Sequence, residues 1–151
     1  MHQTQAYISS NKKRFLDELL DLLRIPSISA DSSYNEDVQK CAKELSKNLT
    51  DIGLSNVKVY STEGHPIVYG EKTIDPKLPT VLIYGHYDVQ PADPLDLWDS
   101  EPFNPVIRTT QLHPDGAIFA RGACDDKGQM FMHVKAVEAM IASGELKCNV
   151  K

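Results

Sequence analysis

The sequence lacks features that several classes of protein require. Its 151 residues contain 16 Lys and Arg against 21 Asp and Glu, and no basic run exceeds Lys12-Lys13-Arg14, which argues against a nucleic-acid surface. No stretch approaches the ~20 apolar residues of a membrane span. Acidic residues interrupt the apolar residues between positions 15 and 23, so a signal peptide is not predicted. We therefore expect no nucleic-acid partner and no membrane association.

Cysteine is also scarce. Cys41, Cys124 and Cys148 are an odd number without any Cys-x-x-Cys spacing, which supports neither a disulfide framework nor a thiolate zinc site. A reducing compartment fits this usage, and we predict a cytoplasmic protein. Cys41 falls on the apolar stripe of a predicted helix and is expected to be a buried small hydrophobe.

Helical and strand patterns alternate along the chain. Apolar residues at helical spacing predict helices over 10–23, 35–52 and 127–143, and shorter apolar or alternating runs predict strands over 56–60, 67–70, 80–84, 106–110 and 117–120, with a further strand beginning near 146. This order predicts an α/β fold, layered α/β/α, with a mixed, largely parallel central sheet. The run 80–84 is predicted to be its buried central strand.

Two histidines and one long loop are interpreted separately. His65 precedes Pro66 in a polar turn and is predicted to be a solvated loop residue. His133 lies one position off the apolar stripe of the last helix and is expected to be exposed or half-buried. The stretch 91–105 carries four prolines and Trp98, which favour an ordered, functional loop.

His86 and Asp88 follow the predicted central strand. In an extended backbone, side chains two positions apart lie on the same face, so the imidazole and the carboxylate point the same way. Such a pair is a metal ligand with its orienting carboxylate, or a base with its carboxylate. A loop histidine beside a solvated aspartate has the same spacing, so the spacing alone leaves these alternatives open.

Two further acids, Asp125 and Asp126, lie between a predicted strand and the start of the last predicted helix. A helix N-terminus stabilises carboxylates, and a capping role accounts for one of them. The other acid is then available for a different role.

Four blocks of sequence resemble a known enzyme family in their order and approximate spacing. They are 85–91 (Gly-His-Tyr-Asp-Val-Gln-Pro), 98–103 (Trp-Asp-Ser-Glu-Pro-Phe), 115–116 (Asp-Gly) and 121–128 (Arg-Gly-Ala-Cys-Asp-Asp-Lys-Gly). The chain thereby resembles the di-zinc metallopeptidases that include carnosinase-like dipeptidases, acetylornithine deacetylase, succinyl-diaminopimelate desuccinylase, aminoacylase and carboxypeptidase G. The first two blocks look most like the dipeptidase branch, and the run 22–29 also resembles the family's first helix and turn.

The resemblance implies roles for three residues. His86 corresponds to a ligand of one zinc ion, Asp88 to the catalytic carboxylate that orients this histidine, and Asp125 to the acid that bridges two zinc ions. Manganese and cobalt accept the same ligands. The family also implies a cis peptide bond between Asp125 and Asp126. Cys124 stands where the family accepts several small residues, so a nucleophilic thiol is not expected.

The function implied by the family is hydrolysis of a peptide bond in a dipeptide, or of the amide bond of an N-acyl amino acid, by a water shared between two metals. In the family the general-base glutamate, the remaining ligands and a lid or dimerisation domain follow this part of the sequence. We therefore expect residues 1–151 to be the N-terminal portion of a metallopeptidase catalytic domain, with the rest of that domain and the lid absent.

This interpretation has consequences for the chain and for its parent protein. The parent is expected to be a homodimeric enzyme acting on small peptides. The 151-residue chain is expected to be inactive, to bind metal weakly or not at all, and to self-associate through exposed strand edges. The alternative is a non-catalytic binding or regulatory module that keeps the peptidase fold. Intact His86, Asp88 and Asp125 argue against that alternative, because a module without metal has no need of them.

Overall fold

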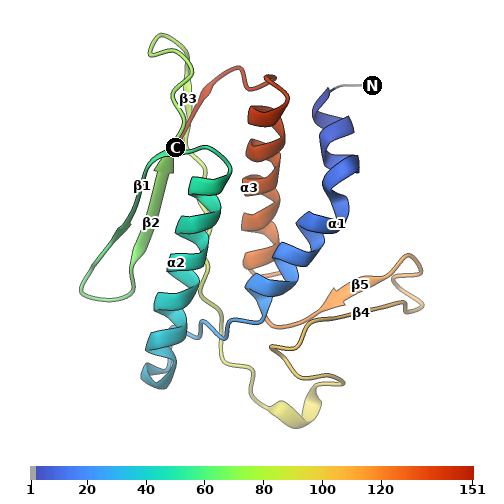
Figure 1. Cartoon of the computed structure of the whole chain (residues 1–151). Coiled ribbons are helices and arrows are strands. Elements are labelled where there is room, and N and C mark those ends of the chain that lie inside the picture. The colour runs from blue at the N-terminus through green and yellow to red at the C-terminus, as the bar shows by residue number, and fades with distance from the viewer. Residues whose placement is uncertain (1–2) are drawn as a thin grey trace.

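The computed structural model describes residues 3–151 (Figure 1). Its helices are α1 (Gln3–Leu23), α2 (Asn35–Asp51) and α3 (Lys127–Ala142), with short 3-10 helices at Ser32–Tyr34 and Leu95–Leu97. Its strands are β1 (Ser55–Tyr60), β2 (Ile67–Glu71), β3 (Thr80–Val81), β4 (Val106–Arg108), β5 (Ala117–Phe119) and β6 (Asn149–Val150). No helix within residues 3–151 combines the length and the apolar character needed to cross a bilayer.

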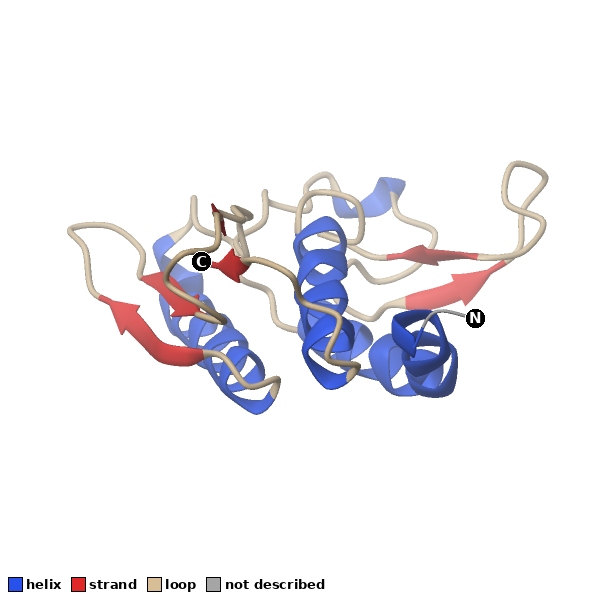
Figure 2. Ribbon diagram, turned by 90° about the horizontal axis from the view of Figure 1, so that it is seen from above, coloured by secondary structure: helices blue, strands red, loops and turns tan. Residues whose placement is uncertain are grey.

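The three long helices share one core. Helix α3 lies between α2 and α1 in both views of the ribbon (Figures 1 and 2). The main cluster of buried residues draws on all three helices and on the turns that follow α1 and α2: Leu22, Ile25, Cys41, Leu45, Ile52, Met130, Phe131 and Val134. Tyr87 packs against this cluster, so the core fixes the segment that carries His86 and Asp88.

The helices agree with the sequence pattern except at one end. Helix α1 begins at Gln3, seven residues before the predicted start. Its first turns bond to α3 and the residue that follows it, through the hydroxyls of Thr4 and Ser143 and the hydrogen bond from Tyr7 to Glu138, contacts that the sequence pattern does not contain. Helices α2 and α3 end one residue before the predicted ends. Gly53 and Gly144, the predicted stops, have φ angles of +91° and +68°, the left-handed conformation that glycine adopts most readily.

The strands form three pairs. Strands β1 and β2 are antiparallel, β3 and β6 are parallel, and β4 and β5 form the predicted antiparallel hairpin. A bridge between Lys72 and Val150 also joins the end of β2 to β6, so β6 lies between β2 and β3. The α/β class is confirmed. Within residues 3–151 the sheet consists of these short strand pairs, one of them parallel and two antiparallel.

The predicted burial of the run 80–84 is wrong. Only Thr80 and Val81 are in a strand, and Leu82 and Tyr84 are 77% and 83% exposed. The reason is the short pairing: β6 pairs only with Thr80 and Val81 of this run, and beyond the hydrogen bond from the Ile83 amide to the Lys151 carbonyl, 2.8 Å long, no described strand pairs with residues 82–84. Apolar side chains in a run such as 80–84 become buried only where neighbouring strands and helices cover them.

Candidate metal centre

His86 and Asp88 lie on an extended segment after β3, and their side chains face each other as predicted. The His86 Nδ1 atom is 3.1 Å from the Asp88 carboxylate Oδ1 and 3.1 Å from the Asp88 backbone oxygen. Both oxygens accept hydrogen bonds, so Nδ1 carries a hydrogen and donates it. In the neutral ring, Nε2 is then left with its lone pair available.

Asp125 approaches the other side of the same imidazole. Its carboxylate Oδ1 lies 3.2 Å from His86 Nε2, although the two residues are 39 positions apart in the sequence. The Asp125 side chain is otherwise largely exposed. The fold therefore brings together all three residues that the motifs single out, with the imidazole between two carboxylates.

Asp126 has a role that differs from the predicted cap. It occupies the N-cap position of α3, but its side chain makes no capping hydrogen bond. Its Oδ2 instead accepts a hydrogen bond from the His86 backbone amide, 3.0 Å away. Asp126 thus ties the two arms of the site to each other. The peptide bond between Asp125 and Asp126 is cis, as the family resemblance implied.

The pKa of His86 reflects the charged groups around its ring. Burial lowers the pKa of His86, but the hydrogen bond to the Asp88 backbone and the charges of Asp88 and Asp126 outweigh burial, so the pKa is raised above the ordinary 6.5. A cation that binds at Nε2 must displace the proton held there, so its affinity falls with falling pH.

The residues present fit two ligands of a metal. Two ligands on one tetrahedral zinc ion lie about 3.4 Å apart when each bond is about 2.1 Å long, and the His86 Nε2 to Asp125 Oδ1 distance is 3.2 Å. Across residues 3–151, however, no group of at least three His, Cys, Asp or Glu side chains is placed to hold a metal ion. The described chain therefore offers an incomplete set.

Lys127, two residues after Asp125, anchors this turn to the C-terminal end of α1. This lysine is fully buried, and its Nζ donates to the carbonyls of Leu22 and Ile25 at 3.0 and 2.7 Å. Burial lowers the pKa of Lys127. Sequence reasoning did not identify this residue, because its partners lie more than 100 positions away.

The loop 91–105 is anchored as its composition predicted. The Trp98 indole Nε1 donates to the Ala92 carbonyl at 2.8 Å, and the Arg121 guanidinium lies 5.1 Å from the centre of the Trp98 ring. Arg121 also donates to the Pro91 carbonyl at 3.0 Å. These contacts join the loop to the start of the block that carries Asp125.

The predictions for the remaining histidines and cysteines have mixed outcomes. His133 is exposed, as predicted. His65 is half-buried rather than solvated, because its Nε2 lies 2.9 Å from the Ser29 carbonyl. Cys41 is fully buried and Cys124 is exposed, and both are free thiols, as is Cys148.

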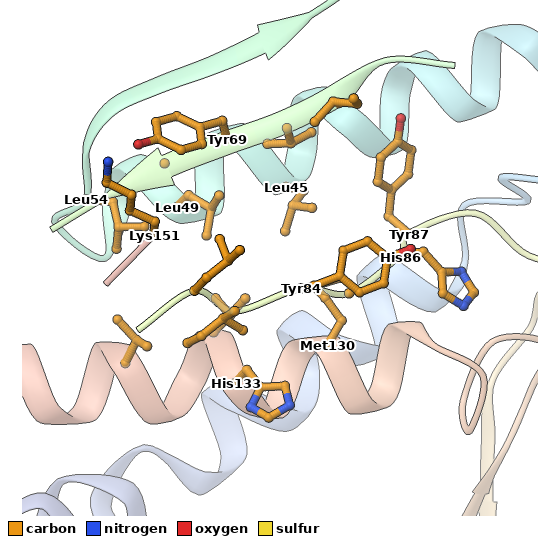
Figure 3. A pocket seen from close by; sticks show the side chains of 18 of the residues that line it. Leu45, Leu49, Leu54, Tyr69, Tyr84, His86, Tyr87, Met130, His133 and Lys151 are labelled. Carbon is orange, nitrogen blue, oxygen red and sulfur yellow. The ribbon is translucent and has the colours of Figure 1, made fainter. Parts of the chain in front are cut away.

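A large apolar groove adjoins the candidate centre (Figure 3). Its volume is about 620 Å³. In Figure 3, Leu45 of α2 and Tyr69 of β2 lie on one side of the segment that carries Tyr84, and Met130 and His133 of α3 lie on the other. The groove occupies the space left open between β2 and the exposed run 82–84, and residues from Tyr84 to Asp88 also line it.

Comparison with known proteins shows which proteins this chain resembles. Residues 82–151 match the model of Peptidase family M20/M25/M40. The chain is 35% identical over 150 residues to the Cys-Gly metallodipeptidase DUG1 of Saccharomyces cerevisiae, covering 91% of this chain and 30% of the relative. It is 38% identical over 87 residues to the human Beta-Ala-His dipeptidase, covering 57% of this chain and 16% of that protein.

Solved structures agree. The structure of the dipeptidase Dug1p from Saccharomyces cerevisiae superposes with a TM-score of 0.86 at 34% identity, over 98% of this chain and 33% of that one. Human carnosine dipeptidase 1 superposes with a TM-score of 0.81 at 26% identity, over 97% of this chain and 32% of that one. The matched regions thus span between 16% and 33% of the length of these relatives. The chain is similar to the metallodipeptidases of the M20 peptidase family in both sequence and fold. These comparisons confirm the resemblance inferred from its motifs.

Proposed function

We propose that residues 1–151 form part of the catalytic domain of a metal-dependent dipeptidase and that His86, Asp88 and Asp125 belong to its metal centre. The observation that carries the proposal is the placement of the His86 imidazole between the carboxylates of Asp88 and Asp125. Both carboxylates are partly exposed, with 38% and 78% of their side-chain surface open to solvent, so both are accessible to an ion. A metal site gives all three side chains a common purpose.

Each residue has a distinct task in this proposal. His86 binds a metal through Nε2, and Asp88 orients the ring by accepting the hydrogen on Nδ1. The Asp125 carboxylate would also hold metal, at the position that the family resemblance assigns to the acid shared by two ions. A bound zinc pair would supply an activated water and a positive charge that polarises a peptide carbonyl. Asp126 holds the His86 backbone in place by accepting its amide hydrogen.

The substrate class proposed for the parent protein is a small peptide. Relatives of the chain are named for Cys-Gly and β-Ala-His dipeptides, and amide bonds of N-acyl amino acids are the wider class. The remaining ligands and the general base are proposed to lie outside residues 1–151, since this chain covers about 30% of DUG1. We infer that the parent protein is a homodimer and that it lies in the cytoplasm. A reducing compartment suits three cysteines that form no disulfide.

Metal binding tests the site directly. Calorimetric titration of the metal-free chain with zinc should show weak binding, because His86 and Asp125 fall short of the three protein ligands usual for catalytic zinc. The binding should disappear in His86→Ala and in Asp125→Asn. His133→Ala, which changes an exposed histidine of α3, is the matched control and should leave the titration unchanged. Equal heats for wild type and His86→Ala would refute the proposed site.

Activity is the second test. We expect the 151-residue chain to leave Cys-Gly and β-Ala-His intact in the presence of zinc, manganese or cobalt, because its ligand set is incomplete. Hydrolysis that survives in His86→Ala indicates a contaminating peptidase. Hydrolysis that this substitution abolishes would show that the chain is itself an enzyme.

A second candidate is a non-catalytic module that binds a peptide. The apolar groove of about 620 Å³ favours it, since grooves of this kind take up peptide segments. The affinity of such a module for a peptide would not change with His86→Ala or with added zinc. The metallopeptidase proposal instead requires that the affinity for zinc depend on His86.

A further inference from the structure

The segment that follows α1 runs alongside the segment that carries His86 and Asp88. Ile28 and Val89 form a parallel bridge. The Val89 amide donates to the Ser27 carbonyl at 2.9 Å, and the Ser27 hydroxyl donates to the Tyr87 carbonyl at 2.7 Å. Ser27, Ile28 and Val89 are all buried. The two segments therefore have a fixed register, which pairs residue 28 with residue 89 and leaves the side chain of residue 29 within reach of Asp88, diagonally across the pair.

At that position Ser29 contacts the carboxylate of Asp88. Its hydroxyl donates to Asp88 Oδ2 at 2.5 Å, a distance at the short end of the range for a hydroxyl bonded to a charged oxygen. The other oxygen, Asp88 Oδ1, receives the hydrogen of His86 Nδ1. A continuous chain of hydrogen bonds thus runs from the Ser29 hydroxyl through Asp88 to the imidazole.

Ser29 is also held from a second direction. Its backbone carbonyl lies 2.9 Å from Nε2 of His65, in the turn between β1 and β2. A carbonyl only accepts hydrogen bonds, so His65 donates from Nε2. The position of Ser29 is therefore set by the pairing with residues 87–89 and by His65, through bonds that do not use the Asp88 side chain.

We propose that Ser29 is a positioning residue for the metal centre. Its hydroxyl fixes one oxygen of Asp88 so that the other holds the hydrogen of His86 on Nδ1, which leaves Nε2, 3.2 Å from Asp125 Oδ1, as the nitrogen that would bind a metal. The inference rests on the proposed function, because positioning matters only if Nε2 binds a metal. Partners of this kind, one step beyond the ligands, typically change metal affinity by about 10- to 100-fold when they are removed.

The first experiment reads the imidazole without any metal. The 15N shifts of the His86 ring distinguish a hydrogen on Nδ1 from one on Nε2, at a pH where the ring is neutral. We expect the Nδ1–H form to dominate in the wild type and the Nε2–H form to rise in Ser29→Ala. Ser29→Thr, which restores a hydroxyl, should restore the wild-type ratio. An unchanged ratio in Ser29→Ala would overturn the inference.

Matched variants separate positioning from folding. Ser33→Ala removes an exposed hydroxyl that bonds Asp31, away from the site, and should leave the His86 ring unchanged. If Ser29→Ala does not fold, Ser29→Cys keeps the side-chain size with a much weaker donor and is subject to the same expectation. A loss of stability alone would not shift the ratio of the two ring forms in the folded protein.

The second experiment measures zinc affinity in the same variants. We expect Ser29→Ala to weaken binding about tenfold and Ser29→Thr to recover it. If the wild type binds no zinc, the weak site expected of this chain alone is refuted, while the ring measurement still decides whether Ser29 positions His86. If zinc binds equally well to wild type and Ser29→Ala, Ser29 has no part in metal binding.

Discussion

Gly128 shows how closely the turn that carries Asp125 is packed. A Cβ atom at residue 128 would lie 1.9 Å from the Ala123 carbonyl oxygen, and this oxygen is backbone and cannot move aside cheaply. We expect Gly128→Ala to lower the free energy of unfolding by about 3 kcal/mol or more, measured by urea denaturation. Gly64→Ala, where the nearest atom is 3.8 Å away, should have almost no effect. Equal stability of the two variants would contradict this account.

At the scale of single residues, the sequence indicated the three residues of the proposed site but not the residues that hold them in place. His86, Asp88 and Asp125 were predictable because each stands in a motif. Ser29 and Asp126 were not assigned their partners, since their hydrogen bonds join residues 59 and 40 positions apart. Such bonds depend on the register between segments, and a single sequence does not contain that register.

Helices α1 and α3 are joined by a charged network around Glu138, which provides a test by pH. The Glu138 carboxylate bonds Arg14 and accepts from Lys135 at 2.9 Å and from Tyr7 at 3.1 Å. Burial raises the pKa of Glu138, but the hydrogen bonds from Arg14 and Lys135 outweigh it, so the pKa lies below the ordinary 4.5. The unfolded chain therefore binds more protons near this pH, and stability is lost as pH falls.

We expect the free energy of unfolding to decrease as the pH is lowered from the ordinary pKa of 4.5 through the lower folded value. Glu138→Gln should be less stable at neutral pH and should show a shallower acid dependence. Asp21→Asn removes an exposed partner of Arg24 and should retain the full dependence. Thermal unfolding followed over the acid range measures both, and a wild-type slope in Glu138→Gln would rule out this role for the carboxylate.

At the scale of elements, periodicity predicted the helices well because apolar residues of all three meet in the shared core. It failed for the run 80–84, whose apolar residues suggested a buried strand. Val81 and Leu82 are exposed. An apolar run indicates that a segment tends to be buried, but it does not show whether a neighbouring element covers that segment. The pairing of β6 with both β2 and β3 likewise depends on contacts between distant segments.

The whole molecule leaves an apolar surface open. The groove between α2, β2 and α3 is lined by Leu82 and Tyr84, and these side chains are 77% and 83% exposed. Exposed apolar patches and unpaired strand edges favour association with another chain. We therefore expect the 151-residue chain to self-associate, with a weight-average mass by light scattering that rises above 16.9 kDa as concentration increases.

A charge in the groove should reverse this association. Leu82→Lys places an ammonium among apolar side chains that a second chain would have to cover, so the mass measured by light scattering should return toward that of a monomer. Leu112→Lys is the matched control, because Leu112 is 86% exposed but lies in the turn between β4 and β5, outside the groove. It should associate like the wild type. If both variants behave alike, association does not use the groove; if the wild type is a monomer throughout, this exposed surface is tolerated by the isolated chain.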